Sequence, residues 1–177
     1  MHAAGGDSSL AARNQALVAV MYRAALRSAE ACSLVPGDVD TRTGTVNVRH
    51  GKGGRQRKVG IDGDALALLR RWLEHRQALG LNGRQPLFCS LQGRPLSTSY
   101  LRKLLPDLAA RAGVERRVNP HCLRHTRAAE LAEAGVPVNV IQRALGHASL
   151  ATTDRYLAHV APTQVLDSMA AGWRLGG

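Results

Sequence analysis

The chain has 177 residues, enough for one domain with a substantial core, and its formal net charge is +11. Apolar residues make up 45% of it but aromatic residues only 3%, so Leu, Val and Ala must build the core, which favours helices. The positive charge indicates a polyanionic partner, and no apolar run approaches the roughly 18 residues that would cross a bilayer, so we expect no membrane segment.

The N-terminal half predicts helices around a small sheet. The first nine residues are small and polar, and we expect them to be flexible before a helix over 10–26. Ser28 is expected to start a second, short helix. Alternating valines, a Gly-rich turn and the segment RKVGI predict a β-hairpin over 44–61. Asp64 is expected to cap the helix that follows.

The C-terminal half predicts further helices and no second sheet. A loop over 80–97 precedes the helical segment TSYLRKLLPDLAARAG, and HCLRHTRAAELAEAG is the clearest helix. PVNVIQRALG and TTDRYLAHV predict two shorter helices, and the tail over 162–177 predicts one more. The sequence therefore predicts one mainly α domain with a small antiparallel β-sheet, an α+β fold. Three distant cysteines without a CxxC pair, and no visible signal peptide, favour a reducing, cytoplasmic location.

The segment NPHCLRHTRAAEL carries the clearest candidate site. His121 and Arg124 are three residues apart on one helix face, near the start of the helix. An imidazole, a guanidinium fork and free backbone N–H groups at that place predict an oxyanion site. The spacing of His121 and His125 would also suit a metal ion, but the central Glu of a zinc-protease motif is missing, so we expect no metal.

Four other residues are ambiguous when they are considered without the rest of the sequence. Lys52 lies on the Gly-rich turn, whose spacing does not fit a phosphate-binding P-loop, so the turn could be merely solvated. Arg27 and Glu30 have the spacing of an ordinary surface ion pair. Tyr156, one of only three tyrosines, is either a packed, hydrogen-bonded side chain or a nucleophile.

Taken in chain order, the residues resemble the catalytic domain of tyrosine recombinases, the phage-integrase family; that order is Arg27, Lys52, His121-x-x-Arg124, Leu145-Gly146-His147 and Tyr156. ALRSAE is similar to the family's Gly-Leu-Arg-x-Ser-Glu box, with Ala25 in place of Gly and Ala29 in place of Ser. GKGGRQRKVGI is similar to its Gly-Lys-Gly-x-x-x-Arg hairpin, although Gly60 stands where Pro is usual. HCLRHTRAAELAEAG and IQRALGHASLATTDRYLAHV resemble its second box, and the nine-residue step from His147 to Tyr156 fits it.

The resemblance implies DNA strand cleavage by the phenol of Tyr156. The product is a 3′-phosphotyrosyl link with a free 5′-hydroxyl, and rejoining needs neither ATP nor another cofactor. Arg27 and Arg124 would clamp the non-bridging oxygens as their negative charge grows, the role that a divalent metal takes in other phosphoryl transfers. His147 would donate a further hydrogen bond to the same oxygens.

The remaining implied roles concern protons and support. Lys52 would protonate the leaving 5′-oxygen, which is a strong base. His121 would accept the proton of Tyr156. Glu30 would orient the site without reacting.

The resemblance covers residues 10–160 and makes double-stranded DNA the expected partner. We expect a catalytic domain over 10–161 and a tail over 162–177 that docks on its own domain or on a neighbour. Family members assemble as a tetrameric synapse on DNA and usually carry an N-terminal helical domain, for which this chain has no room. Its DNA affinity should then come from phosphate contacts. The residues expected to make them are Arg55, Arg57, Lys58, Arg102 and Lys103.

Three alternatives remain open at this point. A type IB topoisomerase-like enzyme would use the same cleavage but relax one duplex. The cadence of VPVNVIQRALGHASLATTDRYL also suits a non-catalytic helix–turn–helix DNA-binding module, although such a module has no use for Tyr156, Lys52 and Arg27 together. An RNA-binding basic domain would need the stacking aromatic residues that this chain lacks.

Overall fold

The computed structural model describes residues 3–49 and 56–146, which form helices around one three-stranded antiparallel sheet. This confirms the expected α+β class. The elements are, in chain order, α1 (Ala3–Arg23), α2 (Ser28–Ser33), the 3-10 turn η1 (Pro36–Asp38), β1 (Val39–Asp40), β2 (Thr45–Val48), β3 (Arg57–Gly60), α3 (Gly63–Ala78), α4 (Thr98–Arg111), α5 (Pro120–Glu133) and α6 (Val138–Leu145). The helices expected in TTDRYLAHV and in the tail lie outside the described residues.

The sheet has the strand order β1-β2-β3, with β2 between its two antiparallel neighbours. The expected hairpin is confirmed, and β1 is an addition that the sequence did not reveal. Gly44 makes the tight turn before β2 with φ +70°, and a Cβ there would lie 2.7 Å from the Ile61 carbonyl oxygen. Only glycine fits this place without strain.

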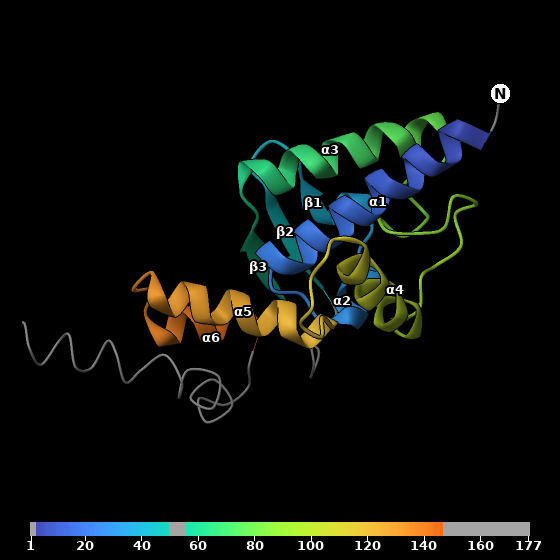
Figure 1. Ribbon diagram of the computed structural model, residues 1–177. Helices are drawn as coiled ribbons and strands as arrows, with labels where there is room; N and C mark the ends of the chain where they lie inside the picture. Colours follow the sequence, from blue (N-terminus) through green and yellow to red (C-terminus); the bar gives the residue numbers. More distant parts are fainter. Residues whose placement is uncertain (1–2, 50–55, 147–177) are drawn as a thin grey trace, which may run out of the picture.

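The main core lies where α1 and α3, which run side by side (Figure 1), meet the sheet and α2. Leu17 and Met21 of α1 and Leu69 and Trp72 of α3 are fully buried there. The indole of Trp72 donates to the Leu87 carbonyl at 2.8 Å, which satisfies its one polar group. Helices rich in Leu and Ala thus supply most of the core, as the scarcity of aromatic residues required.

Three helix boundaries differ from the expected ones. Helix α1 begins at Ala3, so residues 3–9 form its first turns, and it ends at Arg23 because Ala25 turns left-handed with φ 48°. Asp62, not Asp64, caps α3 by accepting from the Ala65 N–H at 3.0 Å. These differences concern ends and caps, which local preferences define poorly.

Two buried arginines make their hydrogen bonds within the fold itself. Arg76 is 2% exposed and donates to several carbonyls of the loop over 80–97, including Pro86 at 2.6 Å. Arg13, equally buried, donates to the Cys89 carbonyl and to the Tyr100 hydroxyl. Part of the positive charge is therefore structural and does not face a partner.

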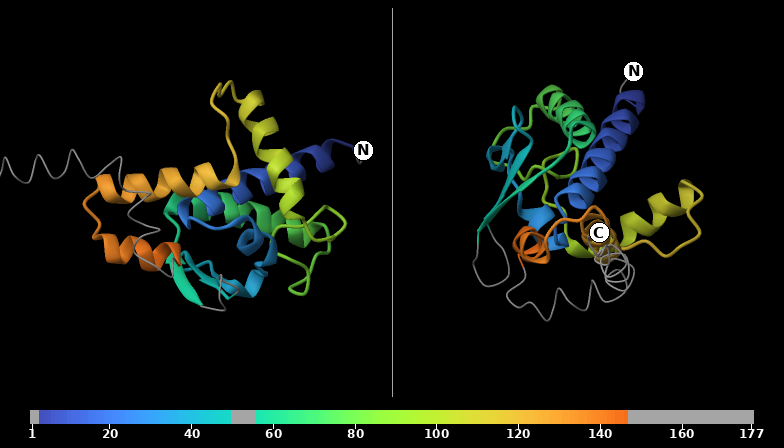
Figure 2. Two further views of the ribbon diagram at one scale, coloured as in Figure 1. Left: turned by 90° about the horizontal axis from the view of Figure 1, so that it is seen from below. Right: turned by 90° about the vertical axis from the view of Figure 1, so that its left-hand side faces the viewer.

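A second, smaller apolar cluster joins α5 and α6 to the turn after α1. Its buried members are Ala25, Ala128, Ala132, Ile141 and Leu145. The two helices lie together at one end of the molecule, where α6 contacts β3, while α4 projects from another side (Figure 2). This packing brings the last turn of α6 next to α2 and β3. In the part of the chain that the structure describes, no helix is both long and apolar enough to cross a bilayer.

Candidate active site

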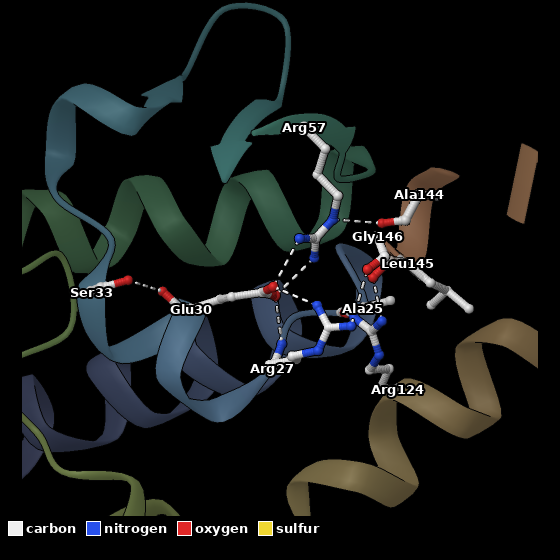
Figure 3. A network of polar contacts seen from close by, with 9 residues as sticks. All are labelled: Ala25, Arg27, Glu30, Ser33, Arg57, Arg124, Ala144, Leu145 and Gly146. Carbon is white, nitrogen blue, oxygen red and sulfur yellow. Dashed lines mark hydrogen bonds and ion pairs between the residues drawn. The ribbon is translucent and has the colours of Figure 1, made fainter. Parts of the chain in front are cut away.

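The last turn of α6 gathers arginines from three other elements (Figure 3). The pairs are Arg57 Nε with the Ala144 carbonyl at 2.8 Å, Arg124 Nη2 with the Leu145 carbonyl, and Arg27 Nη2 with the Gly146 carbonyl at 3.2 Å. The last carbonyls of a helix lack intrahelical partners and carry partial negative charge, so guanidinium groups are favoured there. Three successive carbonyls of one chain segment thus orient three cations.

Arg124 comes from the second turn of α5 and is only 3% exposed. Besides the Leu145 carbonyl it reaches the Ala25 carbonyl, to which its Nη1 donates at 2.5 Å. Ala25 has the left-handed backbone that glycine would adopt freely, at a cost of about 1–2 kcal/mol for an L-residue. The alanine that replaces glycine in the first motif therefore keeps the turn, and its carbonyl still holds the arginine.

Arg27 stands immediately before α2 and is bound to Glu30, one turn into that helix. Its backbone N–H donates to Glu30 Oε2 at 2.8 Å and its Nη1 donates to Oε1 at 2.9 Å. The Glu30 side chain is 1% exposed, whereas that of Arg27 is 28% exposed. The pair is therefore not the surface ion pair that was one alternative, because its carboxylate is buried.

Arg57, which was expected at DNA phosphates, makes its described contacts inside the protein. Its Nη1 and Nη2 donate to the two carboxylate oxygens of Glu30, each at 2.8 Å, and its Nε to Ala144. The side chain is only 9% exposed. The cause is strand alternation, which turns Arg57 inward with Val59 and leaves Lys58 exposed on the opposite face. The structure thus uses Arg57 inside the protein.

Glu30 is ionised because its partners outweigh its burial. Burial alone raises the pKa of this carboxyl, but hydrogen bonds from Arg57 and from the Arg27 backbone, with the charge of Arg57, lower that pKa to about 2. Glu30 is therefore a fixed anion that two guanidinium groups share.

Glu30 should make the stability of the protein depend on pH in the acid range. Its folded pKa lies below its unfolded value of 4.5, so the contribution is complete above that value and is lost as pH falls toward about 2. The shift corresponds to about 3 kcal/mol. Urea unfolding across this range should show the advantage of the wild type over Glu30→Gln shrinking by about that amount.

The exposed Glu133 at the end of α5 provides the matched control. The difference between wild type and Glu133→Gln should stay nearly constant over the same range, because this carboxylate faces solvent. An advantage over Glu30→Gln that does not change with pH would show that the ion pairs of Glu30 do not stabilise the fold.

His121 lies in the first turn of α5, at the rim of a hollow of about 340 Å³. Asn119 caps the helix by accepting from the N–H groups of His121 and Cys122. Arg102 of α4, expected to contact DNA, lines the same hollow, as does Arg117. Arg117 was not among the predicted site residues, although its position two residues before Asn119, beside the second motif, was a usable signal.

The remaining predicted site residues are either exposed or outside the described part of the chain. Lys58 and Lys103 are exposed, on β3 and α4. Lys52, Arg55, His147 and Tyr156 lie outside the described residues, so their roles stay predictions. Among residues 3–49 and 56–146, no three His, Cys, Asp or Glu side chains gather in a way that could hold a metal ion.

Comparison with known proteins decides the family. The model of the phage integrase family matches residues 1–162, most of the chain.

The chain belongs to the phage integrase family.

Curated members of this family align with most of this chain. It is 38% identical over 150 residues to tyrosine recombinase XerC of Xylella fastidiosa, covering 85% of the chain and 50% of the relative. It is 39% identical over 163 residues to tyrosine recombinase XerD of Mycobacterium tuberculosis, covering 88% and 52%. The chain thus spans about half the length of the curated relatives it matches.

The fold agrees with a solved member of the family. The structure is similar, with a TM-score of 0.76 and 31% identity, to the XerH site-specific recombinase bound to a palindromic difH substrate in a post-cleavage complex. The match covers 95% of this chain and 48% of XerH. The described part of the chain therefore shares its fold with a solved member of the family.

Proposed function

We propose that the chain is the catalytic domain, over residues 10–161, of a site-specific DNA recombinase that cleaves and rejoins strands through a 3′-phosphotyrosyl intermediate. The observation that carries this proposal is the seating of Arg27 and Arg124 on adjacent carbonyls of one helix end. Arginines fixed in this way are preorganised donors for an oxyanion, which stabilise the transition state without reorganising during the reaction. The names of the relatives agree with this reaction class.

The arginines supply the charge for the chemical step. As Tyr156 attacks, negative charge grows on the non-bridging oxygens of the phosphate, and the guanidinium groups of Arg27 and Arg124 take it up. Arg27 keeps 28% of its side chain exposed, so it can meet a phosphate that arrives from solvent. The resemblance supplies His147 as a further donor to the same oxygens.

Two further residues move protons in this proposal. Lys52 protonates the leaving 5′-oxygen, and His121 accepts the proton that Tyr156 must lose. The exposed position of His121 at the start of α5, beside a hollow with Arg102 and Arg117, is consistent with work at a DNA surface.

The proposed partner is double-stranded DNA. The net charge of +11 and the exposed Lys58, Arg102 and Lys103 support contacts to phosphates. The related XerH was solved on its difH substrate. We propose self-association on DNA, with the segment over 162–177 as a docking tail. The three cysteines are free thiols, in keeping with a reducing, cytoplasmic compartment. The comparisons favour neither a topoisomerase nor a non-catalytic module.

Covalent capture tests the proposed function directly. Since the target sequence is unknown, the probe is a pool of labelled duplexes with randomised centres and a nick in one strand, at low salt. Cleavage near the nick releases a short strand and traps the protein on DNA. We expect a labelled adduct that survives denaturing electrophoresis and forms equally well in excess EDTA, because arginines and a lysine take the cationic roles.

Two outcomes would contradict this proposal. The absence of any adduct with the wild-type chain would show that the proposed cleavage activity is wrong. Loss of the adduct on chelation, with recovery on adding magnesium, would remove the metal-independent mechanism.

A further inference from the structure

We infer that Arg57 is a positioning residue that keeps Arg27 and Arg124 active as a pair, by compensating Glu30 and by holding the last turn of α6. This inference rests on the proposed function, because it concerns the same reaction. The side chain of Arg57 points into the protein: it is 9% exposed, and its three guanidinium nitrogens all donate to protein oxygens.

The first part of the argument concerns charge. The carboxylate of Glu30 binds Arg27 through one oxygen at 2.9 Å and Arg57 through both oxygens at 2.8 Å. Two cations thus share one buried anion, so the group keeps a net positive charge. Without Arg57, Glu30 would be compensated by Arg27 alone, and the cation offered to the phosphate would be largely neutralised. In a buried site such charges are weakly screened, so this loss of positive charge should weaken stabilisation of the transition state.

The second part concerns the backbone that holds the other arginines. Arg57 Nε binds the Ala144 carbonyl, the neighbour of the two carbonyls that receive Arg124 and Arg27. Arg57 also packs against Gly146, where an added Cβ would lie 3.1 Å from Arg57 Nη1 and 3.2 Å from its Cδ. Gly146 is left-handed, with φ +63°, and caps α6. The side chain of Arg57 therefore lies directly against the turn that orients the pair.

Only an arginine makes all of these contacts. Its planar fork binds both oxygens of Glu30 while Nε points to a third acceptor, whereas the single nitrogen of lysine carries the charge without this geometry. Charge and geometry can therefore be separated by substitution. Arg57→Gln removes the charge, and Arg57→Lys keeps it.

The test measures adduct formation on the nicked-duplex pool at saturating protein, with DNA affinity measured separately by fluorescence anisotropy. Arg57→Gln should slow adduct formation by about 10²-fold, comparable to the loss of one transition-state donor, while DNA affinity changes by less than about threefold. Arg57→Lys should recover about tenfold of the lost rate, because it restores the charge.

Arg42→Gln is the matched control, since it removes one positive charge from an arginine that is 89% exposed and contacts only Asp40 in the described structure. Its rate of adduct formation should equal that of the wild type. An Arg57→Gln rate equal to the wild-type rate would overturn the inference. So would equal losses of rate and affinity, which would return Arg57 to the DNA-contact role.

Arg57→Gln leaves the buried Glu30 with one partner fewer, and this could impair folding. A double-mutant cycle keeps the test decisive in that case. Folding is checked by thermal denaturation. In a Glu30→Gln background no carboxylate neutralises Arg27, so adding Arg57→Gln should slow the reaction by only about threefold further. Equal effects of Arg57→Gln in both backgrounds would overturn the charge argument. If wild type forms no adduct, the proposed function fails; if only these variants behave otherwise, the inference alone fails.

Discussion

Tyr156→Phe should abolish the covalent protein–DNA adduct and leave DNA affinity almost unchanged. The substitution removes one hydroxyl, which is the proposed nucleophile, and keeps the ring and the net charge. Affinity for DNA comes mainly from phosphate contacts, which this change does not touch. The measurement is denaturing electrophoresis of the trapped nicked duplex, with anisotropy under native conditions at the same salt concentration.

The chain offers matched controls, because it has only two other tyrosines. The hydroxyl of Tyr100 accepts from Arg13 at 2.6 Å, and that of Tyr22 donates to Glu130. Tyr100→Phe and Tyr22→Phe remove these hydrogen bonds to charged groups, at about 1.5–3 kcal/mol of stability each, but should still form the adduct. An adduct formed by Tyr156→Phe would show that the nucleophile is another residue.

Lys52→Ala should slow cleavage of ordinary DNA by about 10²–10⁴-fold, the range for loss of a general acid. The leaving 5′-oxygen is a strong base and departs slowly unless it is protonated. Replacing that oxygen with sulfur gives a leaving group that needs no proton. Cleavage of the 5′-thio substrate should therefore be nearly as fast in Lys52→Ala as in the wild type, measured as single-turnover rates.

Arg124→Ala is the control for this rescue. In the proposed reaction its guanidinium acts on the non-bridging oxygens, which the sulfur does not change, so this variant should stay slow on both substrates. Equal rescue of the two variants, or rescue of neither, would remove Lys52 from the acid role.

Much of this fold follows from sequence patterns, and the hairpin shows why. The alternation around Val46 and Val48 has the period of a half-buried strand, and the pairing of β2 with β3 confirms it. Strand β1, with only Val39 and Asp40, is too short to show any period. The end of α1 was also hidden, since Ala and Leu after Arg23 favour a longer helix. Tertiary contacts override that preference, because Arg124 takes the Ala25 carbonyl as an acceptor.

The candidate site was predictable as a set of motifs but not as a geometry. The resemblance to the family placed Arg27, Glu30 and Arg124 in it, and the structure brings these three together. Arg57 was assigned to the DNA surface because its neighbours are basic. The alternation with Val59 was a signal that Arg57 points inward. Only the structure shows that Glu30 and Ala144 are its partners there.

In the proposed function, the three carbonyls at the end of α6 couple local folding to binding of the phosphate substrate. Helix α6 has 8 residues, and isolated helices shorter than about 12–15 residues are marginal in water, so its docking depends on the small cluster around Ile141 and Leu145. Undocking would remove the acceptors of all three arginines at once. A phosphate that needs Arg27 and Arg124 in place binds only the docked form and so stabilises it by mass action. On the proposed function, the arginine site and the last helix turn share one thermodynamic linkage, so a core residue such as Ile141 should influence the fraction of molecules able to react.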